Sequence, residues 1–287
     1  MQPSLLSKMH IEDSRIITLV GAGGKTSLMY SLGKEMSPHH KTLLTTTTHI
    51  MEPRDLPGAR LITEENQEQL ITAFQSSRLV ALGLPLSATD RRASSDRPDF
   101  LPDSFNTSAR LSAAFSPKWS SPSLSFLEKI RDIPERILCE GDGSRRLPVK
   151  VPRTGEPVFF PGTDTVIGVI GLSCLGRPAE TCLFGWTPDL DFPALQATLQ
   201  KSGGRMTPEA LAIIALSSSG LKKNITTQKY HVIFNQADCL RENELPEIIK
   251  AAQKIRDNGA DCHIVSLKKE FLIHFSIADR SPKQNPL

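Results

Sequence analysis

Short apolar runs alternate with amphipathic segments along much of the chain. The runs predicted as strands are 16–20, 41–46, 60–63, 78–84, 136–139, 165–172, 230–234 and 262–265. Helical periodicity follows several of them, and in the segment 25–36 it places Leu28, Met29, Leu32 and Met36 on one face. This β-α-β alternation predicts an α/β fold, a mostly parallel sheet with helices on both faces.

Two segments depart from this pattern. Residues 87–123 are rich in Ser, Pro, Arg and Asp and have few periodic apolar positions, which predicts a long, mobile surface excursion. Residues 281–287 are predicted to form a frayed tail. The rest is expected to fold as a single domain, so that one domain spans residues 1–287.

Composition narrows the class of protein. Apolar residues make up 39% and charged residues 23%, which is globular, and a net charge of +3 does not predict nucleic-acid binding. No apolar run approaches the roughly 18 residues of a membrane helix. The first 14 residues contain no apolar region of the kind that a secretory signal peptide has. The five cysteines form no Cys-x-x-Cys pair, so we expect a protein of the reducing cytoplasm that does not act at a membrane.

The strongest chemical signal is a glycine-rich turn between a predicted strand and a predicted helix. Glycines let backbone amides approach a phosphate, and a helix start adds unpaired N–H groups. Lys25 would face solvent and reach the terminal phosphates, and the Thr26 hydroxyl would bind Mg²⁺. Leu19 replaces the first glycine of the longer P-loop pattern, so the shorter form G-x-x-G-K-T is the one that is met. The predicted nucleotide-binding residues are Gly21, Ala22, Gly23, Gly24, Lys25, Thr26 and Ser27.

Polar clusters follow two other predicted strands. Thr46 and Thr47 lie at the end of the second strand, where hydroxyls would bind Mg²⁺ or the γ-phosphate or position water; a β-branched strand end with a turn is the alternative. Glu140 and Asp142 follow the strand 136–139, and either acid would hold Mg²⁺ or orient the attacking group. The cations expected to bind an anionic substrate come next in the chain, namely Arg145, Arg146 and Lys150.

A fourth motif, Asn235-Gln236-Ala237-Asp238, follows the strand 230–234. GTPases place Asn-Lys-x-Asp at such a strand end, where the aspartate accepts hydrogen bonds from guanine. Here Gln236 replaces the lysine. Asn235 and Asp238 would contact the base of a nucleotide. A motif of only four residues is equally compatible with an ordinary turn.

Several blocks together resemble the YqeC-like family of accessory proteins for selenium-dependent molybdenum hydroxylases. The matching blocks are LVGAGGKTSLMYSLG, LLTTTTHI, EGDGSRRLPVKVP, EPVFFPGTDTVIGVIGLSCLGRP and VIFNQAD. The resemblance implies a P-loop nucleotide-binding protein that helps to mature enzymes of the xanthine-dehydrogenase type, with the apoenzyme or its maturation factors as partners. The chain departs from the family pattern at Gly155, where members often carry a histidine.

These observations predict a P-loop domain that binds ATP or GTP with Mg²⁺ and hydrolyses it, with Lys25 and either Glu140 or Asp142 as catalytic groups. One alternative is a nucleotide-sensing chaperone without turnover. Another is an ATP-dependent ligase or kinase of the Mur type, with a small anionic substrate near Arg145 and Arg146.

Overall fold

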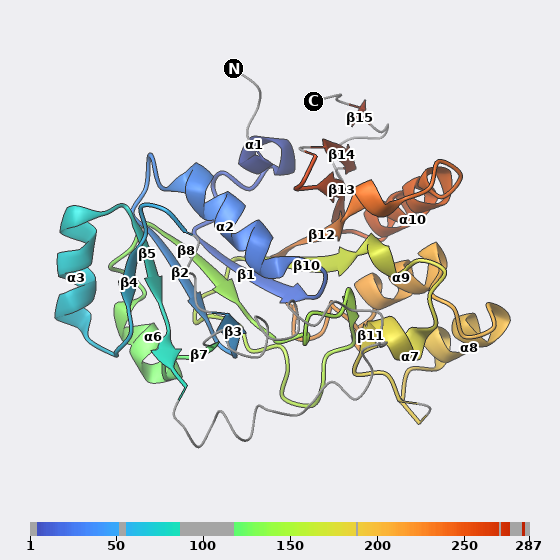
Figure 1. Ribbon diagram of the computed structural model, residues 1–287, viewed down its shortest axis with the longest axis horizontal. Helices are drawn as coiled ribbons and strands as arrows, with labels where there is room; N and C mark the ends of the chain where they lie inside the picture. The colour runs from blue at the N-terminus through green and yellow to red at the C-terminus, as the bar shows by residue number, and fades with distance from the viewer. Residues whose placement is uncertain are drawn as a thin grey trace, which may run out of the picture.

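A twisted, mostly parallel sheet runs through the centre of the protein (Figure 1). The computed structural model describes residues 5–51, 56–86, 118–187, 189–269, 271–275 and 283–284. Within these ranges the strand order is β15-β14-β13-β12-β10-β1-β8-β2-β5-β4. The eight strands from β13 to β4 are parallel, and β14 and β15 add an antiparallel edge.

Eight of the ten strands agree closely with the apolar runs of the sequence, whereas the edge strands β14 and β15 were not predicted. The strand bounds are β1 Ile16–Gly21, β2 Thr42–Thr46, β4 Arg60–Ile62, β5 Leu79–Leu82, β8 Arg136–Glu140, β10 Thr165–Gly171, β12 Lys229–Asn235, β13 Asp261–Ser266, β14 Phe271–Phe275 and β15 Lys283–Gln284. Every residue of β1, β2, β5 and β10 is buried, as expected for parallel strands covered on both faces.

Helices cover both faces of the sheet, which confirms the predicted α/β architecture. Along β1, Ile17 and Leu19 pack with the apolar face of α2 (Lys25–Met36), whereas Ile16 and Val20 belong to clusters on the opposite face. The helix α1 (Leu5–Met9) joins α2 on the first face. The helices whose buried residues join the clusters of the second face are α3 (Gln67–Ser76), α6 (Leu124–Ile130), α8 (Pro193–Lys201), α9 (Pro208–Leu216) and α10 (Leu245–Asp257).

Short elements complete the described chain. They are β3 (Ile50–Met51), β6 (Leu84–Pro85), β7 (Lys118–Ser120), β9 (Val149–Lys150), β11 (Leu183–Phe184), α7 (Ala179–Cys182) and the 3₁₀ turns η1 (Leu172–Cys174) and η2 (Ala237–Cys239). β9 and β11 pair in parallel, and β3, β7 and β6 form an antiparallel sheet. No helix in the described ranges is long and apolar enough to cross a membrane.

The end of the predicted excursion 87–123 belongs to the core, which corrects the expectation of a mobile surface segment up to residue 123. Trp119 in β7 is buried and packs so closely on Gly83 that a Cβ there would lie 2.4 Å from the indole ring. Ser123 accepts a hydrogen bond from the Phe126 amide at the start of α6. A single tryptophan has no periodicity to reveal its burial. Residues 87–117 lie outside the described residues, as does the predicted tail except for Lys283 and Gln284 in β15.

Candidate functional site at the carboxyl edge of the sheet

The glycine-rich turn joins β1 to α2, as the sequence predicts. Gly24 has φ 117°, and a Cβ at this position would lie 2.4 Å from Nδ2 of Asn235, so the position requires glycine. No side chain caps the start of α2, although the first N–H groups of a helix lack partners within the helix. The turn therefore presents amide donors at the carboxyl edge of the sheet, where an anion is stabilised.

Lys25, the first residue of α2, is buried, and the expectation that it faces solvent is wrong. Its Nζ donates a hydrogen bond to the Gly21 carbonyl at 2.6 Å. The same atom lies 3.2 Å from Oδ1 of Asp142 and 3.4 Å from Oε1 of Glu140. Burial by itself lowers the pKa of Lys25, but the two carboxylates outweigh burial and raise this pKa above its ordinary value. Lys25 is therefore a charged lysine inside the protein.

Pairing of β8 with β1 brings the two carboxylates to this lysine. Leu19 of β1 pairs with Glu140, the last residue of β8. Two residues later, the fully buried Asp142 accepts a hydrogen bond from the Gly21 amide, which lies 3.1 Å from each of its oxygens. An acidic side chain thus already occupies one amide of the turn.

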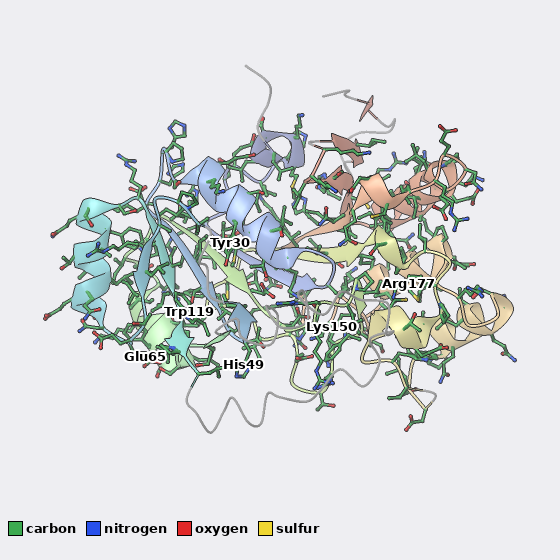
Figure 2. The ribbon with its side chains drawn as sticks, in the orientation of Figure 1. Tyr30, His49, Glu65, Trp119, Lys150 and Arg177 are labelled. Atoms are coloured by element: carbon green, nitrogen blue, oxygen red, sulfur yellow. The ribbon has the colours of Figure 1, made fainter. Side chains whose placement is uncertain are left out.

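A second buried lysine lies on the other side of Asp142. Nζ of Lys150 is 3.4 Å from Oδ2 of Asp142 and 2.6 Å from Oε2 of Glu156. Figure 2 shows Lys150 near the carboxyl ends of the central strands, with the exposed His49 apart from it. Lys150 was predicted from the sequence as a cation for an anionic substrate, and the structure places it instead inside the ion-pair network of Asp142. We call Lys25, Glu140, Asp142, Lys150 and Glu156 the charged cluster.

The hydroxyl of Thr26 lies beside Glu140, one of the two acids that the sequence predicts to hold Mg²⁺. Thr26 Oγ1 donates to Oε2 of Glu140 at 2.7 Å, so a hydroxyl oxygen and a carboxylate are adjacent at the turn. Mg²⁺ takes one or two such protein oxygens and completes its shell with phosphate oxygens and water. This pair therefore fits a nucleotide-bound Mg²⁺. Within the described residues, no group of three His, Cys, Asp or Glu side chains is placed to hold a metal ion alone.

The threonines that end β2 hold the backbone around Glu140. Thr46 Oγ1 donates to the Glu140 carbonyl at 3.0 Å and accepts from the Thr48 amide at 3.0 Å. Thr47 Oγ1 donates to the Val158 carbonyl at 2.6 Å. Both hydroxyls are therefore engaged with the backbone, whereas the sequence predicts them as Mg²⁺ ligands.

The predicted arginines lie on the surface after β8. Arg145 and Arg146 are exposed and have φ values of 48° and 64°, which side chains with a Cβ rarely adopt. The Arg145 guanidinium lies 5.7 Å from the centre of the Phe184 ring, and that of Arg153 lies 4.3 Å from it. Sequence reasoning missed Arg153 and Phe184, because β11 brings Phe184 from a distant part of the chain.

At the end of β12 the structure joins a further predicted residue to the turn. Asn235 is buried and its Nδ2 donates to the Gly23 carbonyl at 2.8 Å. Asp238 lies three residues later in the turn η2. The predicted phosphate and base motifs are thus in direct contact, although more than 200 residues separate them along the chain.

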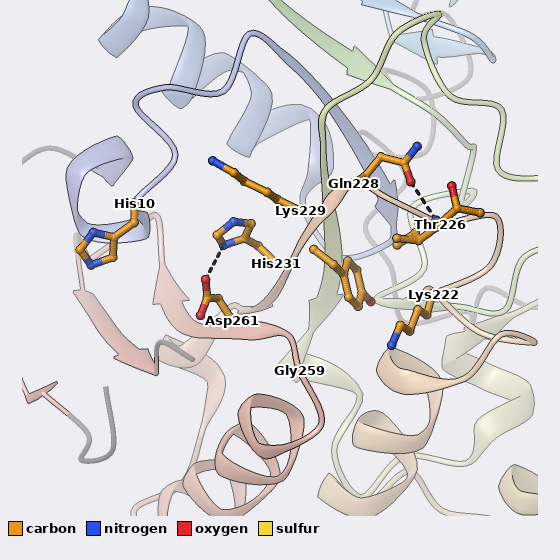
Figure 3. Close-up of a pocket in the computed structure, with 10 residues that line it drawn as sticks. His10, Lys222, Thr226, Gln228, Lys229, His231, Gly259 and Asp261 are labelled. Atoms are coloured by element: carbon orange, nitrogen blue, oxygen red, sulfur yellow. Dashed lines mark hydrogen bonds and ion pairs between the residues drawn. The ribbon is translucent and has the colours of Figure 1, made fainter. Parts of the chain in front are cut away.

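A cavity at the opposite edge of the sheet, of about 460 Å³, escaped the sequence analysis. It is lined by residues at the amino ends of β12 and β13, including His231 and Asp261, whose Nδ1 and Oδ2 atoms lie 3.7 Å apart (Figure 3). His231 also lies 3.3 Å from Nε2 of the buried His263, with the two rings stacked. The sequence could not predict this pairing, because His231 and His263 are single histidines on two different strands.

Comparison with known proteins assigns the chain to a family. The sequence profile of the family described as "YqeC protein" matches residues 17–186, which is more than half of the chain and includes the turn and the charged cluster. The protein described as "Uncharacterized protein YqeC" from Escherichia coli (strain K12) is 28% identical over 195 residues. That match covers 65% of this chain and 64% of the relative, so the chain spans less than two thirds of the relative's length. On the extent of the family match, the chain belongs to the YqeC family.

Proposed function

We propose that this protein is a P-loop NTPase that binds a nucleoside triphosphate with Mg²⁺ at the turn 21–27 and hydrolyses it. The observation that carries the proposal is the charged Lys25, which lies between Glu140 and Asp142 at the start of an uncapped helix. A lysine, two acids and a glycine turn at one strand edge are the groups that phosphoryl transfer requires.

The charge of the cluster predicts that the nucleotide binds only with its metal ion. Lys25 and Lys150 each contribute one positive charge, against three carboxylates from Glu140, Asp142 and Glu156. This excess of negative charge repels a bare triphosphate. Mg²⁺ would be held by Thr26 and Glu140 and supplies the positive charge that neutralises the phosphates.

The proposed reaction needs Lys25 to exchange partners. Its ammonium group would leave the Gly21 carbonyl and the two carboxylates and pair with the β- and γ-phosphate oxygens. Asp142 would accept a hydrogen bond from the attacking water, whose oxygen forms the new bond to the γ-phosphorus. The bond from that phosphorus to the bridging oxygen breaks, and inorganic phosphate and nucleoside diphosphate leave, with the proton of the water passing to the phosphate or to bulk solvent.

We place this cycle in the maturation of selenium-dependent molybdenum hydroxylases, a context that rests on the family resemblance. The triphosphate-bound and diphosphate-bound states would hold the residues around the turn differently, as in other nucleotide switches. A molybdenum hydroxylase apoenzyme would therefore bind one nucleotide state more tightly than the other. Pull-down of the purified apoenzyme with each state tests this directly, and equal capture in both states argues against a switch.

The primary test is a binding panel followed by phosphate release. Fluorescent ATP and GTP are titrated with Mg²⁺ and again with EDTA, and released phosphate is then measured over time. We expect binding with Mg²⁺, a large loss of affinity with EDTA, and slow turnover. Binding without phosphate release favours the nucleotide-sensing chaperone, and release only when an acid or alcohol is added favours the ligase or kinase.

Two variants separate binding from chemistry. Glu140→Gln and Asp142→Asn keep the side-chain shape and remove one charge each. We expect the acid that organises Mg²⁺ or water to lose about 10²-fold in turnover while the nucleotide still binds. Glu242→Gln removes an exposed acid outside the charged cluster and is the control. Unchanged phosphate release from both acid variants would exclude Glu140 and Asp142 from the reaction.

A further inference from the structure

The end of β12 is rigidly connected to the turn 21–27. Asn235 donates its Nδ2 hydrogen to the Gly23 carbonyl at 2.8 Å, and Gly24 leaves room for this amide. β12 is separated from β1 by one strand, β10, so the two lie about 10 Å apart at the usual strand spacing. A nucleotide spans a gap of this size between its α-phosphate and the hydrogen-bonding edge of its base.

Asp238, beyond the end of β12, is oriented by a residue from the neighbouring strand. Ser266, the buried last residue of β13, donates its hydroxyl hydrogen to Oδ1 of Asp238 at 2.8 Å. The Ser266 oxygen in turn accepts the Lys269 amide at 3.2 Å. The Lys269 amide uses a lone pair of the Ser266 oxygen, so the hydroxyl hydrogen remains available for Asp238. Asp238 is thereby held as an acceptor.

Within the part of the chain that the structure describes, the second oxygen of this carboxylate accepts no hydrogen bond, and Asp238 is half-buried. Its neighbour Gln236 is engaged elsewhere, because the Ser173 hydroxyl donates to the Gln236 side-chain oxygen at 2.7 Å. The edge formed by Asn235, Asp238 and Ser266 therefore presents a fixed carboxylate next to the phosphate turn. We call these three residues the base edge.

We infer that the base edge reads guanine, so that the substrate of the proposed NTPase is GTP. This inference rests on the proposed function. Guanine offers two adjacent donors, N1–H and the 2-amino group, to the acceptor-only carboxylate of Asp238. Adenine presents an acceptor at N1 and no 2-amino group, so ATP would leave the carboxylate unpaired. A buried or half-buried acceptor without a partner is costly, which discriminates against adenine.

The test measures the affinities of GTP, ATP and XTP, each with Mg²⁺, for the full chain and for Asp238→Asn. The parent protein is expected to bind GTP about tenfold or more tightly than ATP, which corresponds to one lost hydrogen-bonded pair. The asparagine variant gains a donor for the 2-oxygen of xanthine, so GTP affinity falls, XTP affinity rises and ATP affinity stays the same. Ser266→Ala, which frees Asp238, is expected to narrow the GTP/ATP ratio. Glu242→Gln, four residues from Asp238, is the charge-matched control and should change nothing.

Failure of this inference differs from failure of the proposed function. If triphosphates bind but the parent prefers ATP or shows no preference, and Asp238→Asn changes neither affinity, the base edge is an ordinary turn and the nucleotide site stands. If no triphosphate binds with Mg²⁺, both proposals are overturned. A shift from GTP to XTP in Asp238→Asn, with Glu242→Gln unchanged, supports the guanine assignment.

Discussion

The two edges of the central sheet differ in how their polar groups find partners. At the amino edge, backbone amides and hydroxyls satisfy the polar groups: Asp164 accepts hydrogen bonds from the amides of Arg15 and Ile16, and Ser14 contacts Thr165 at 2.8 Å. At the carboxyl edge, by contrast, the charged cluster concentrates charges around a helix start that no side chain caps. Burying charged side chains costs desolvation free energy, even when they form ion pairs. A concentration of buried charges at one edge is therefore typical of a functional site.

The largest expected effect is that of Lys25→Ala. The variant should bind magnesium nucleoside triphosphate about 100-fold or more weakly, because it removes the cation that we propose to pair with the phosphates. It should also lower the free energy of unfolding by about 3 kcal/mol, because Asp142 and Glu140 lose a buried partner. Equilibrium binding and urea unfolding measure the two effects. Lys34→Ala, on an exposed turn of the same helix, is the control, and parent-like binding by Lys25→Ala would refute the assigned role.

A matched pair of glycines compares the two edges directly. Gly24 has φ 117° and its Cβ would collide with Asn235, whereas Gly259 lines the cavity at the amino edge with φ 84° and open space around it. Gly259→Ala should cost about 1 kcal/mol of stability, the backbone term alone. Gly24→Ala should cost about 1 kcal/mol more and weaken nucleotide binding at least tenfold, because the clash displaces the turn. Equal effects of the two substitutions on binding would contradict a role for the turn.

Removal of a histidine at the amino edge should leave the nucleotide site intact. His263 is fully buried and its Nε2 lies 3.3 Å from Nδ1 of His231. His263→Ala should lower the free energy of unfolding by about 2 kcal/mol, through the cavity and the lost hydrogen bond. Nucleotide affinity should change by less than about twofold, since distant sites act independently. A tenfold loss of affinity would mean that the two edges are coupled.

The smallest effect is expected for a deletion within residues 88–116, replaced by a short Gly/Ser join. Because loop-closure entropy varies slowly with length, stability should change by less than about 1 kcal/mol. Extending the deletion through the buried Trp119 should cost about 3 kcal/mol more. Thermal and urea unfolding of both variants measure the difference. Unfolding of the variant that lacks only residues within 88–116 would show that the deleted segment contributes to the core.

Local sequence patterns were sufficient to predict the α/β architecture and most strands of the parallel sheet. The apolar runs marked β1, β8 and β10 to within one or two residues, because a strand buried on both faces is continuously apolar. The turn 21–26 was recognised for the same reason: a glycine-rich segment between a strand and a helix is a contiguous signal. Elements of one or two residues, such as β9 and β11, and the antiparallel edge strand β14 were not predicted, since their pairing depends on distant partners.

The partners of each side chain were decided by strand order, which no local pattern contains. The placement of β8 beside β1 buries Lys25 between Glu140 and Asp142 and turns an expected surface lysine into part of an ion-pair network. The pairing of β12 with β13 likewise brings Ser266 to Asp238 across 28 residues. Residue types and their order along the chain therefore specify which strand ends carry polar and charged side chains. Contacts between those ends arise only when the sheet assembles, because hydrogen bonds and ion pairs depend on distances that the register of neighbouring strands sets.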